Sequence, residues 1–230
     1  MAHLDDERLS RSMAELARSM TADFDLDETL RRITGAAVAI VPGSESADVL
    51  LIAGPSRFES LASTSGLPPQ LDNLQVSLGE GPCLDAAQET VMTRCNDLRT
   101  DTRWPRFAAA AVEAGVLSIL SFRLYTQTGH SGALNLFSSQ ANAFDSDSEH
   151  TGEALAAHAA VAILASRKEL QFKSALASRD RIGQAKGMLM ERFTIGADRA
   201  FEMMVKLSQE TNTPLAEVAA RVIEAGPDRR

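Results

Sequence analysis

The chain has 230 residues, a formal net charge of −8 at pH 7, 44% hydrophobic residues and 23% charged residues. These proportions exclude a disordered chain, and the length predicts one large domain or two unequal domains. No apolar run reaches the roughly 18 residues of a membrane span, and the acidic start lacks the apolar core of a signal peptide, so we expect a cytoplasmic protein with no membrane partner.

The first part of the chain predicts two helices and then strands. Residues 5–20 and 25–41 carry apolar side chains at helical spacing, and Asp27 is in a position to cap the second helix. After the VPGSES turn, residues 47–54 and 58–66 alternate in part and are separated by Gly54-Pro55. This pattern indicates two antiparallel strands.

Residues 66–82, GLPPQLDNLQVSLGEGP, predict a long loop because glycine and proline punctuate them. A loop of this length inside a compact domain usually carries function. Beyond it we expect a short helix in LDAAQET, a strand over 91–98, a helix over 103–115 that ends at Gly115, and a hairpin formed by 116–127 and 131–140.

The last third of the chain is predicted to be helical. Residues from about 148 to 192 contain no proline and predict one helix that is long for a globular domain. A second helix has one apolar face, composed of Ala200, Phe201, Met204 and Leu207. The third begins at Thr213-Pro214, which places a hydroxyl residue at the N-cap and proline at the first helical position.

The end of the long helix, RIGQAKGMLMERF (residues 181–193), holds two interior glycines, although each costs roughly 1 kcal/mol relative to alanine. Its core face consists of Ile182, Ala185, Leu189 and Phe193. Gly183 and Gly187 lie beside that face, next to Lys186 and Gln184. A patch without Cβ atoms suits either a close contact with another helix or the approach of a nucleic-acid backbone or an extruded base.

The charges are divided unequally along the chain. Residues 167–230 hold 12 Lys and Arg against 9 Asp and Glu, a balance of +3, which leaves −11 for residues 1–166. Such asymmetry favours a nucleic-acid partner for the less acidic part, although two ordinary solvated surfaces would give the same numbers.

The segment IGQAKGMLMERF, followed by ADRAFEMMVKLSQETN and PLAEVAARVI, resembles the ANTAR domain, a three-helix RNA-binding module of bacterial transcription antiterminators. The resemblance covers about residues 178–226 and implies a dimer that binds paired stem-loops in a nascent transcript. It implies RNA contacts from Arg181, Gln184, Lys186, Gly187, Arg192, Asn212 and Thr213. Pro214 and Ala216 stand where many members have basic residues, so Lys186 and Arg192 are expected to supply most of the electrostatic attraction.

Three further motifs resemble a GAF domain, as found before ANTAR domains in actinobacterial proteins: GEGPCLDA (79–86), NDLRTDTRWPRF (96–107) and GALNLFS (132–138). The implied fold class is α+β: an antiparallel sheet of five to six strands with helices on one side and a ligand pocket on the other. A long helix joins it to the all-α ANTAR domain. We expect a sensor domain over 1–165, a helical connector over 166–177 and an RNA-binding domain over 178–226.

Three residues of the sensor are candidates for contact with an unknown small-molecule ligand. Cys83 precedes a short predicted helix, where a thiol can have a lowered pKa, or it is a small residue of the pocket wall. Trp104 either anchors a helix in the core or covers the ligand. Asn135 either points into the pocket or pairs with a neighbouring strand. Cys95 is expected in the core.

No catalytic motif is present, and the cysteine and histidine spacing predicts neither a disulfide framework, nor a metal site, nor a cofactor. Two other functions remain open besides RNA binding. The three-helix tail could bind a protein partner, or its last two helices could act as a DNA-binding helix-turn-helix. We also expect a homodimer, held by Leu155, Ala159 and Ala162 and by the first turns of the connecting helix, with the middle of the connector only loosely paired.

Overall fold

The computed structural model describes residues 25–52, 58–88, 90–124 and 131–226, and the chain divides into two compact units, Met1–Ser166 and Arg167–Arg230. The expected helix over 5–20 and the Gly54-Pro55 connection lie outside the described residues. None of the described helices is both long enough and apolar enough to cross a membrane.

The first unit is built on an antiparallel sheet of five described strands in the order β2-β1-β5-β4-β3. These are β1 (Ser46–Ile52), β2 (Phe58–Leu61), β3 (Met92–Cys95), β4 (Ser118–Leu124) and β5 (Ser131–Ser138). In the centre, Asp48 of β1 lies opposite Asn135 of β5, which lies opposite Ser121 of β4. The predicted five to six antiparallel strands are confirmed.

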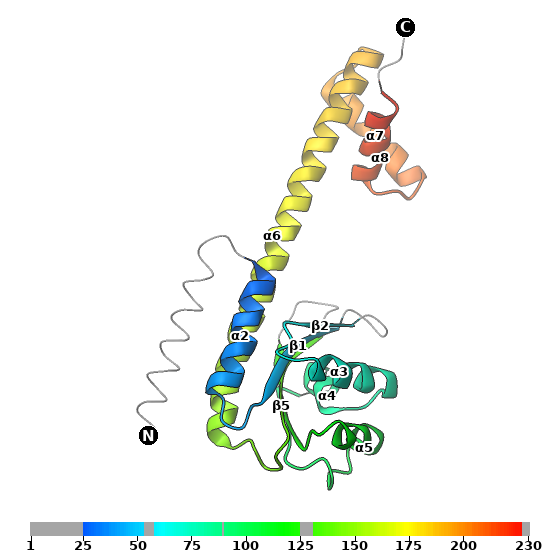
Figure 1. Cartoon of the computed structure of the whole chain (residues 1–230). Helices are drawn as coiled ribbons and strands as arrows, with labels where there is room; N and C mark the ends of the chain where they lie inside the picture. Colours follow the sequence, from blue (N-terminus) through cyan, green and yellow to red (C-terminus); the bar gives the residue numbers. More distant parts are fainter. Residues whose placement is uncertain (1–24, 53–57, 89, 125–130, 227–230) are drawn as a thin grey trace. The chain divides into compact units, whose positions relative to one another are not determined.

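One face of the sheet is covered by α2 (Leu26–Ile40) and the first part of α6 (Ser146–Phe193), as Figure 1 shows. Leu30 and Ile33 of α2 and Leu155 of α6 are fully buried against strand residues such as Val49 and Leu134. The cap of α2 is Asp25 and not Asp27: its carboxylate accepts hydrogen bonds from the N–H groups of residues 27 and 28, at 2.9 and 3.4 Å. The expected Asp27 cap is therefore wrong by two residues.

The predicted dimer contact through the long helix is also wrong in its residues. Leu155, Ala159 and Ala162 are all fully buried within the first unit itself. Leu155 and Ala159 belong to the apolar cluster that covers the sheet, so their surface is not free for a partner.

The opposite face of the sheet is covered by α3 (Leu67–Leu78), α4 (Pro82–Gln88) and α5 (Pro105–Glu113), the teal and green helices of Figure 1. Helices thus cover both faces, not one, and most of the predicted 66–82 loop is helix α3. The prolines of this segment stand in the first turn of α3, where no helical hydrogen bond is lost, and Gly79 ends it in the left-handed conformation (φ 68°). The same residues that mark a loop also mark the two ends of a helix.

The second unit contains the end of α6, then α7 (Ala197–Glu210) and α8 (Leu215–Glu224). α6 is one continuous helix of 48 residues, as predicted. The core of the unit consists of Ala185, Leu189, Ala200, Met204, Val218 and Ala219. Phe193, Phe201 and Leu207, which were expected on core faces, are exposed. Pro214, not Thr213, is the N-cap of α8, and the Thr213 hydroxyl instead donates to the carbonyl of Thr211.

The GEGPC segment joins α3 to α4 and α5 through three different contacts. The Glu80 carboxylate accepts hydrogen bonds from the N–H groups of Arg106 and Phe107, at 2.6 and 2.9 Å, in the first turn of α5. Gly81 has φ 147°, and a Cβ there would collide with the side chain of Gln75. Gln75 in turn accepts a hydrogen bond from the N–H of Cys83 at 2.8 Å. The motif therefore connects the helices of this face.

Gly81→Ala should destabilise the protein by about 1–3 kcal/mol, because it combines an unfavourable backbone conformation with a collision against Gln75. Gly35→Ala is the matched control: Gly35 lies in α2, a Cβ there meets nothing, and the change should stabilise by up to about 1 kcal/mol. Urea unfolding of both variants followed by circular dichroism measures the difference. Equal stability of Gly81→Ala and wild type would contradict the role given to this glycine.

Candidate functional site

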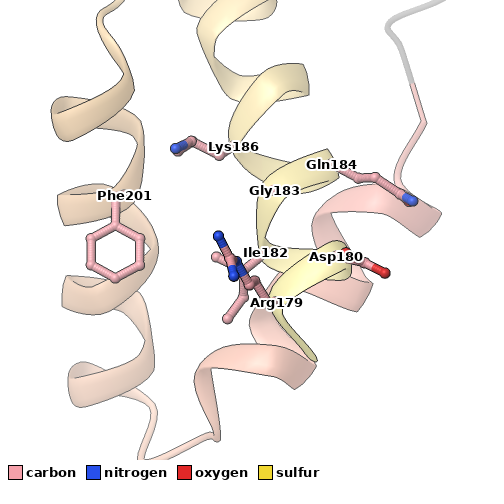
Figure 2. Close-up of a pocket in the computed structure, with 7 residues that line it drawn as sticks. All are labelled: Arg179, Asp180, Ile182, Gly183, Gln184, Lys186 and Phe201. Atoms are coloured by element: carbon pink, nitrogen blue, oxygen red, sulfur yellow. The ribbon is translucent and has the colours of Figure 1, made fainter. Parts of the chain in front are cut away.

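A surface pocket of about 470 Å³ lies in the second unit, between the end of α6 and α7. It is lined by Arg179, Asp180, Ile182, Gly183, Gln184, Lys186 and Phe201. Of the predicted RNA contacts, the structure brings Gln184 and Lys186 to this pocket. Figure 2 shows Lys186 extending from α6 towards α7, whereas Gln184 and Asp180 extend to the other side of α6.

Two cations flank a glycine in this pocket. Arg179, Gly183 and Lys186 are spaced i, i+4 and i+7, so they share one face of α6. Neither Arg179 nor Lys186 forms an ion pair with any residue in the described part of the chain, and the pocket also contains Phe201, whose side chain is 42% exposed. Positive charge and an exposed aromatic ring are thus available to the same ligand.

The two interior glycines of α6 open a gap in this surface. A Cβ added at Gly183 or Gly187 would meet no atom within 4 Å. The described part of this chain therefore contains no close helix contact that needs these glycines. The alternative of a close helix contact within this chain is therefore not supported, and the approach of a nucleic acid stays a prediction.

The other predicted RNA residues have different surroundings. Arg181 is exposed on α6, and its Nε donates to the carbonyl of Ala177 at 3.3 Å. Arg192 Nη2 donates to the carbonyl of Gly226 at 2.7 Å, just beyond the end of α8. Asn212, with φ 48°, and Thr213 form the turn between α7 and α8. None of these four lines the pocket, and their RNA contacts stay predictions.

Sequence reasoning missed Arg179 and the exposure of Phe201. The i, i+4, i+7 spacing of Arg179, Gly183 and Lys186 was available as a signal. Phe201 was not recognisable in this way, because its neighbour Ala200 is fully buried and both belong to one apolar run.

In the sensor, Cys83 and Asn135 lie in one buried polar region between the sheet and α3 and α4. Asn135 Nδ2 donates to Asp48 Oδ1 at 3.0 Å, which is the strand-pairing alternative. Cys83 Sγ accepts from the Ser121 hydroxyl at 3.5 Å. Trp104 is buried elsewhere on this face, where its Nε1 donates to Asp85 Oδ2 at 2.9 Å and the Arg103 guanidinium lies 4.1 Å from its ring centre. A ligand contact by these residues stays a prediction.

Of the two alternatives for Cys83, the lowered pKa is contradicted. Burial raises the pKa of its thiol well above the ordinary value, and the negative charge of Asp72 adds to the effect. Burial likewise raises the pKa of Cys95, a residue of the core in β3, to about 12. Thiolate chemistry is therefore disfavoured at both sites. Among the described residues, no group of three or more His, Cys, Asp and Glu side chains is placed to hold a metal ion.

Two acidic residues that sequence analysis did not single out meet in the same buried region. Asp48 of β1 and Asp72 of α3 are both fully buried and interact directly. Burial raises the pKa of each carboxyl group, and the charge of Asp72 raises that of Asp48 further. Both shifts favour protonation of the pair, and the larger shift is that of Asp48.

Comparison with known proteins agrees with this division of the chain. The GAF domain model matches residues 25–164, and the ANTAR domain model matches residues 170–223. No curated protein shows significant sequence similarity to the chain.

Solved structures show the same sensor fold. A GAF domain of a phosphoenolpyruvate-protein phosphotransferase from Coxiella burnetii is 16% identical, with a TM-score of 0.55, and the match covers 71% of this chain and 96% of that one. A free methionine-R-sulfoxide reductase from Neisseria meningitidis, solved with its substrate, is 17% identical, with a TM-score of 0.56, over 73% and 93% of the two chains. At these identities the likeness concerns the fold alone.

The stability of the protein should fall as pH rises from the ordinary carboxyl pKa of about 4 through the raised pKa values of Asp48 and Asp72, because the folded state then holds protons on this pair that the unfolded state has released. Asp48→Asn should flatten this dependence and raise the melting temperature most at the alkaline end. Carboxyl groups with a lowered pKa, such as Asp101 at about 2, are ionised in both states throughout this range and do not contribute.

Thermal unfolding of the whole chain across this pH range measures the effect. Glu59→Gln, which neutralises an exposed carboxylate on the neighbouring strand β2, is the matched control and should follow the wild-type curve. Parallel curves for Asp48→Asn and wild type would contradict proton sharing by the pair.

Proposed function

The chain belongs to the GAF domain family and carries an ANTAR domain after it, and from this we propose that it is a ligand-responsive RNA-binding regulator of transcription antitermination. Its sensor occupies residues 1–165, its connector 166–177 and its RNA-binding domain 178–226. The RNA-binding domain takes stem-loops of a nascent transcript, and occupancy of the sensor alters that binding.

The observation that carries the RNA proposal is the pocket between α6 and α7. Arg179 and Lys186 lie on either side of Gly183 on one helical face and can each contact a phosphate. The exposed ring of Phe201 offers a stacking surface for an unpaired base. In single-stranded loops, bases are splayed out and backbones are accessible, so one loop can use both features.

This combination favours RNA loops over the two alternatives. A DNA duplex keeps its bases stacked and would leave Phe201 unused. A protein partner would more commonly require a larger apolar surface than the pocket presents. Parallel binding assays with a stem-loop RNA, a DNA duplex of the same sequence and candidate proteins separate the three.

Phe201→Ala should weaken binding to stem-loop RNA by about 1–3 kcal/mol with little change in salt dependence, because it removes stacking and no charge. Lys186→Ala should reduce the slope of log affinity against log salt by about one unit if the ammonium contacts phosphate. Electrophoretic mobility shifts at several salt concentrations measure both.

The chain offers a matched control for each variant. Phe193 is another exposed phenylalanine of the second unit that does not line the pocket, so Phe193→Ala should bind normally. Lys206 is an exposed lysine whose Nζ lies 3.7 Å from Glu210 Oε1, and Lys206→Ala is the control for Lys186→Ala. Gly187→Leu should reduce RNA binding without loss of stability, since a Cβ there meets no atom within 4 Å in the part of the chain that the structure describes. Equal losses for Phe201→Ala and Phe193→Ala would exclude the pocket as the site.

We further propose that the protein is a homodimer in which the connector part of α6 pairs with its copy. Phe172 and Leu176 are spaced i, i+4 on one side of the helix, and their side chains are 70% and 49% exposed. Large apolar side chains at this spacing are typical of the seam between paired helices. Leu170, 63% exposed, lies on the opposite side.

Phe172→Glu should convert the dimer to a monomer at micromolar concentration, because it places a charge in the seam. Leu170→Glu is the matched control: it removes an equally exposed apolar side chain from the other side of the helix and should leave the dimer intact. Light scattering coupled to size-exclusion chromatography gives the masses. A wild-type protein that is monomeric would contradict the dimer, and dissociation by both variants would contradict this seam.

A further inference from the structure

A row of polar side chains crosses the centre of the sheet on the face that α3 and α4 cover. Asp48, Asn135, Ser121 and Thr93 lie directly opposite one another on β1, β5, β4 and β3. The first three are fully inaccessible, and Thr93 is buried. Their neighbours on the same face are apolar, as in Leu50, Ile119 and Phe137, so the row interrupts a hydrophobic core.

The covering helix adds further polar groups to the same place. Asp72 and Gln75 of α3 are also fully buried. Asp72 Oδ2 accepts from the Ser60 hydroxyl at 2.5 Å, and Gln75 Oε1 accepts from the N–H of Cys83 at 2.8 Å. In each of these two side chains, one polar atom therefore forms a hydrogen bond and the other has no partner among the described residues.

The leftover atoms have a definite chemistry. Asp48 Oδ2, Asp72 Oδ1 and Asn135 Oδ1 are acceptors, Gln75 Nε2 is a donor, and all four are buried without a hydrogen-bond partner among the described residues. No described basic residue forms an ion pair with either aspartate, and the only ionisable group that shifts the pKa of each is the other aspartate. A buried polar atom without a partner costs free energy, so four of them in one place call for an explanation.

A shared proton explains only part of this set. One proton between the two aspartates satisfies one oxygen of each, but it gives nothing to the Asn135 amide oxygen or the Gln75 amide nitrogen. What complements all four atoms is a group with several N–H donors, a positive charge opposite the two carboxyls, and one acceptor for Gln75.

We propose that Asp48, Asp72, Gln75 and Asn135 form a ligand site in the sensor that takes a small organic cation through a protonated nitrogen bearing N–H donors. This inference rests on the proposed ligand-responsive function and names the chemical class of the ligand. When the cation binds, its charge replaces the shared proton, which goes to solvent, so two carboxylates surround one cation. Because the site is fully covered, the ligand displaces α3, and ligand occupancy is thereby coupled to the position of that helix.

The test uses the whole chain and three small probes of similar size. Methylguanidinium carries charge and N–H donors, tetramethylammonium carries charge without donors, and N-methylurea carries donors without charge. Only methylguanidinium at millimolar concentration should raise the melting temperature, because binding to the native state stabilises it. Isothermal titration in two buffers of different ionisation enthalpy should show release of up to one proton for each cation bound.

Variants locate the site. Asp72→Asn should weaken methylguanidinium binding at least tenfold, whereas Glu59→Gln, which neutralises an exposed carboxylate of β2, should bind as wild type does. The comparison of probes on the wild-type protein needs no variant, so it decides the matter even if Asp72→Asn does not fold.

Three outcomes would overturn the inference: no stabilisation by methylguanidinium, equal stabilisation by all three probes, or unchanged binding by folded Asp72→Asn. Stem-loop RNA binding is measured on the same preparations. RNA binding without cation binding overturns this site alone. Cation binding without RNA binding overturns the proposed RNA function and leaves the site standing.

Discussion

Burial of both faces of a five-stranded sheet is the constraint on which the first unit depends. One face is closed by α2 and α6 around an apolar cluster. The other is closed by three shorter helices that must fit over a row of polar side chains. Because one face is already supplied with apolar contacts, the second can carry groups that weaken its packing. The proposed ligand site therefore lies on the side of the sheet opposite to α2 and α6.

The elements with a clear period could be predicted from the sequence. The 48-residue helix and the glycine patch beside its core face follow from spacing alone, and both agree with the structure. The error over 66–82 arose because proline and glycine mark helix ends as well as loops, and only tertiary contacts decide between the two. The prediction of helices on only one side of the sheet failed for the same reason, because long-range packing decides which faces helices cover.

The candidate sites were predicted less completely, for physical reasons that differ between them. The meeting of Asp48 and Asp72 depends on the placement of α3 over β1, which no local pattern encodes. The thiol of Cys83 illustrates the reverse case: a helix start favours the thiolate, but burial beside a carboxylate outweighs that effect. In the second unit, Lys186 and Gln184 were predicted beside the glycine patch because helical geometry fixes their direction once the core face is known, and both line the pocket.

Arg192 joins the two ends of the second unit, since its guanidinium binds the carbonyl of Gly226 at the close of α8. The resemblance to RNA-binding domains assigns the same residue to the electrostatic surface. If basic residues are replaced by alanine and only RNA affinity is measured, two different defects give the same loss of affinity. One is a surface that no longer attracts phosphate, and the other is a three-helix unit in which α8 is no longer held by Arg192. Amide exchange in α8 would tell these defects apart, because only the second exposes that helix to solvent.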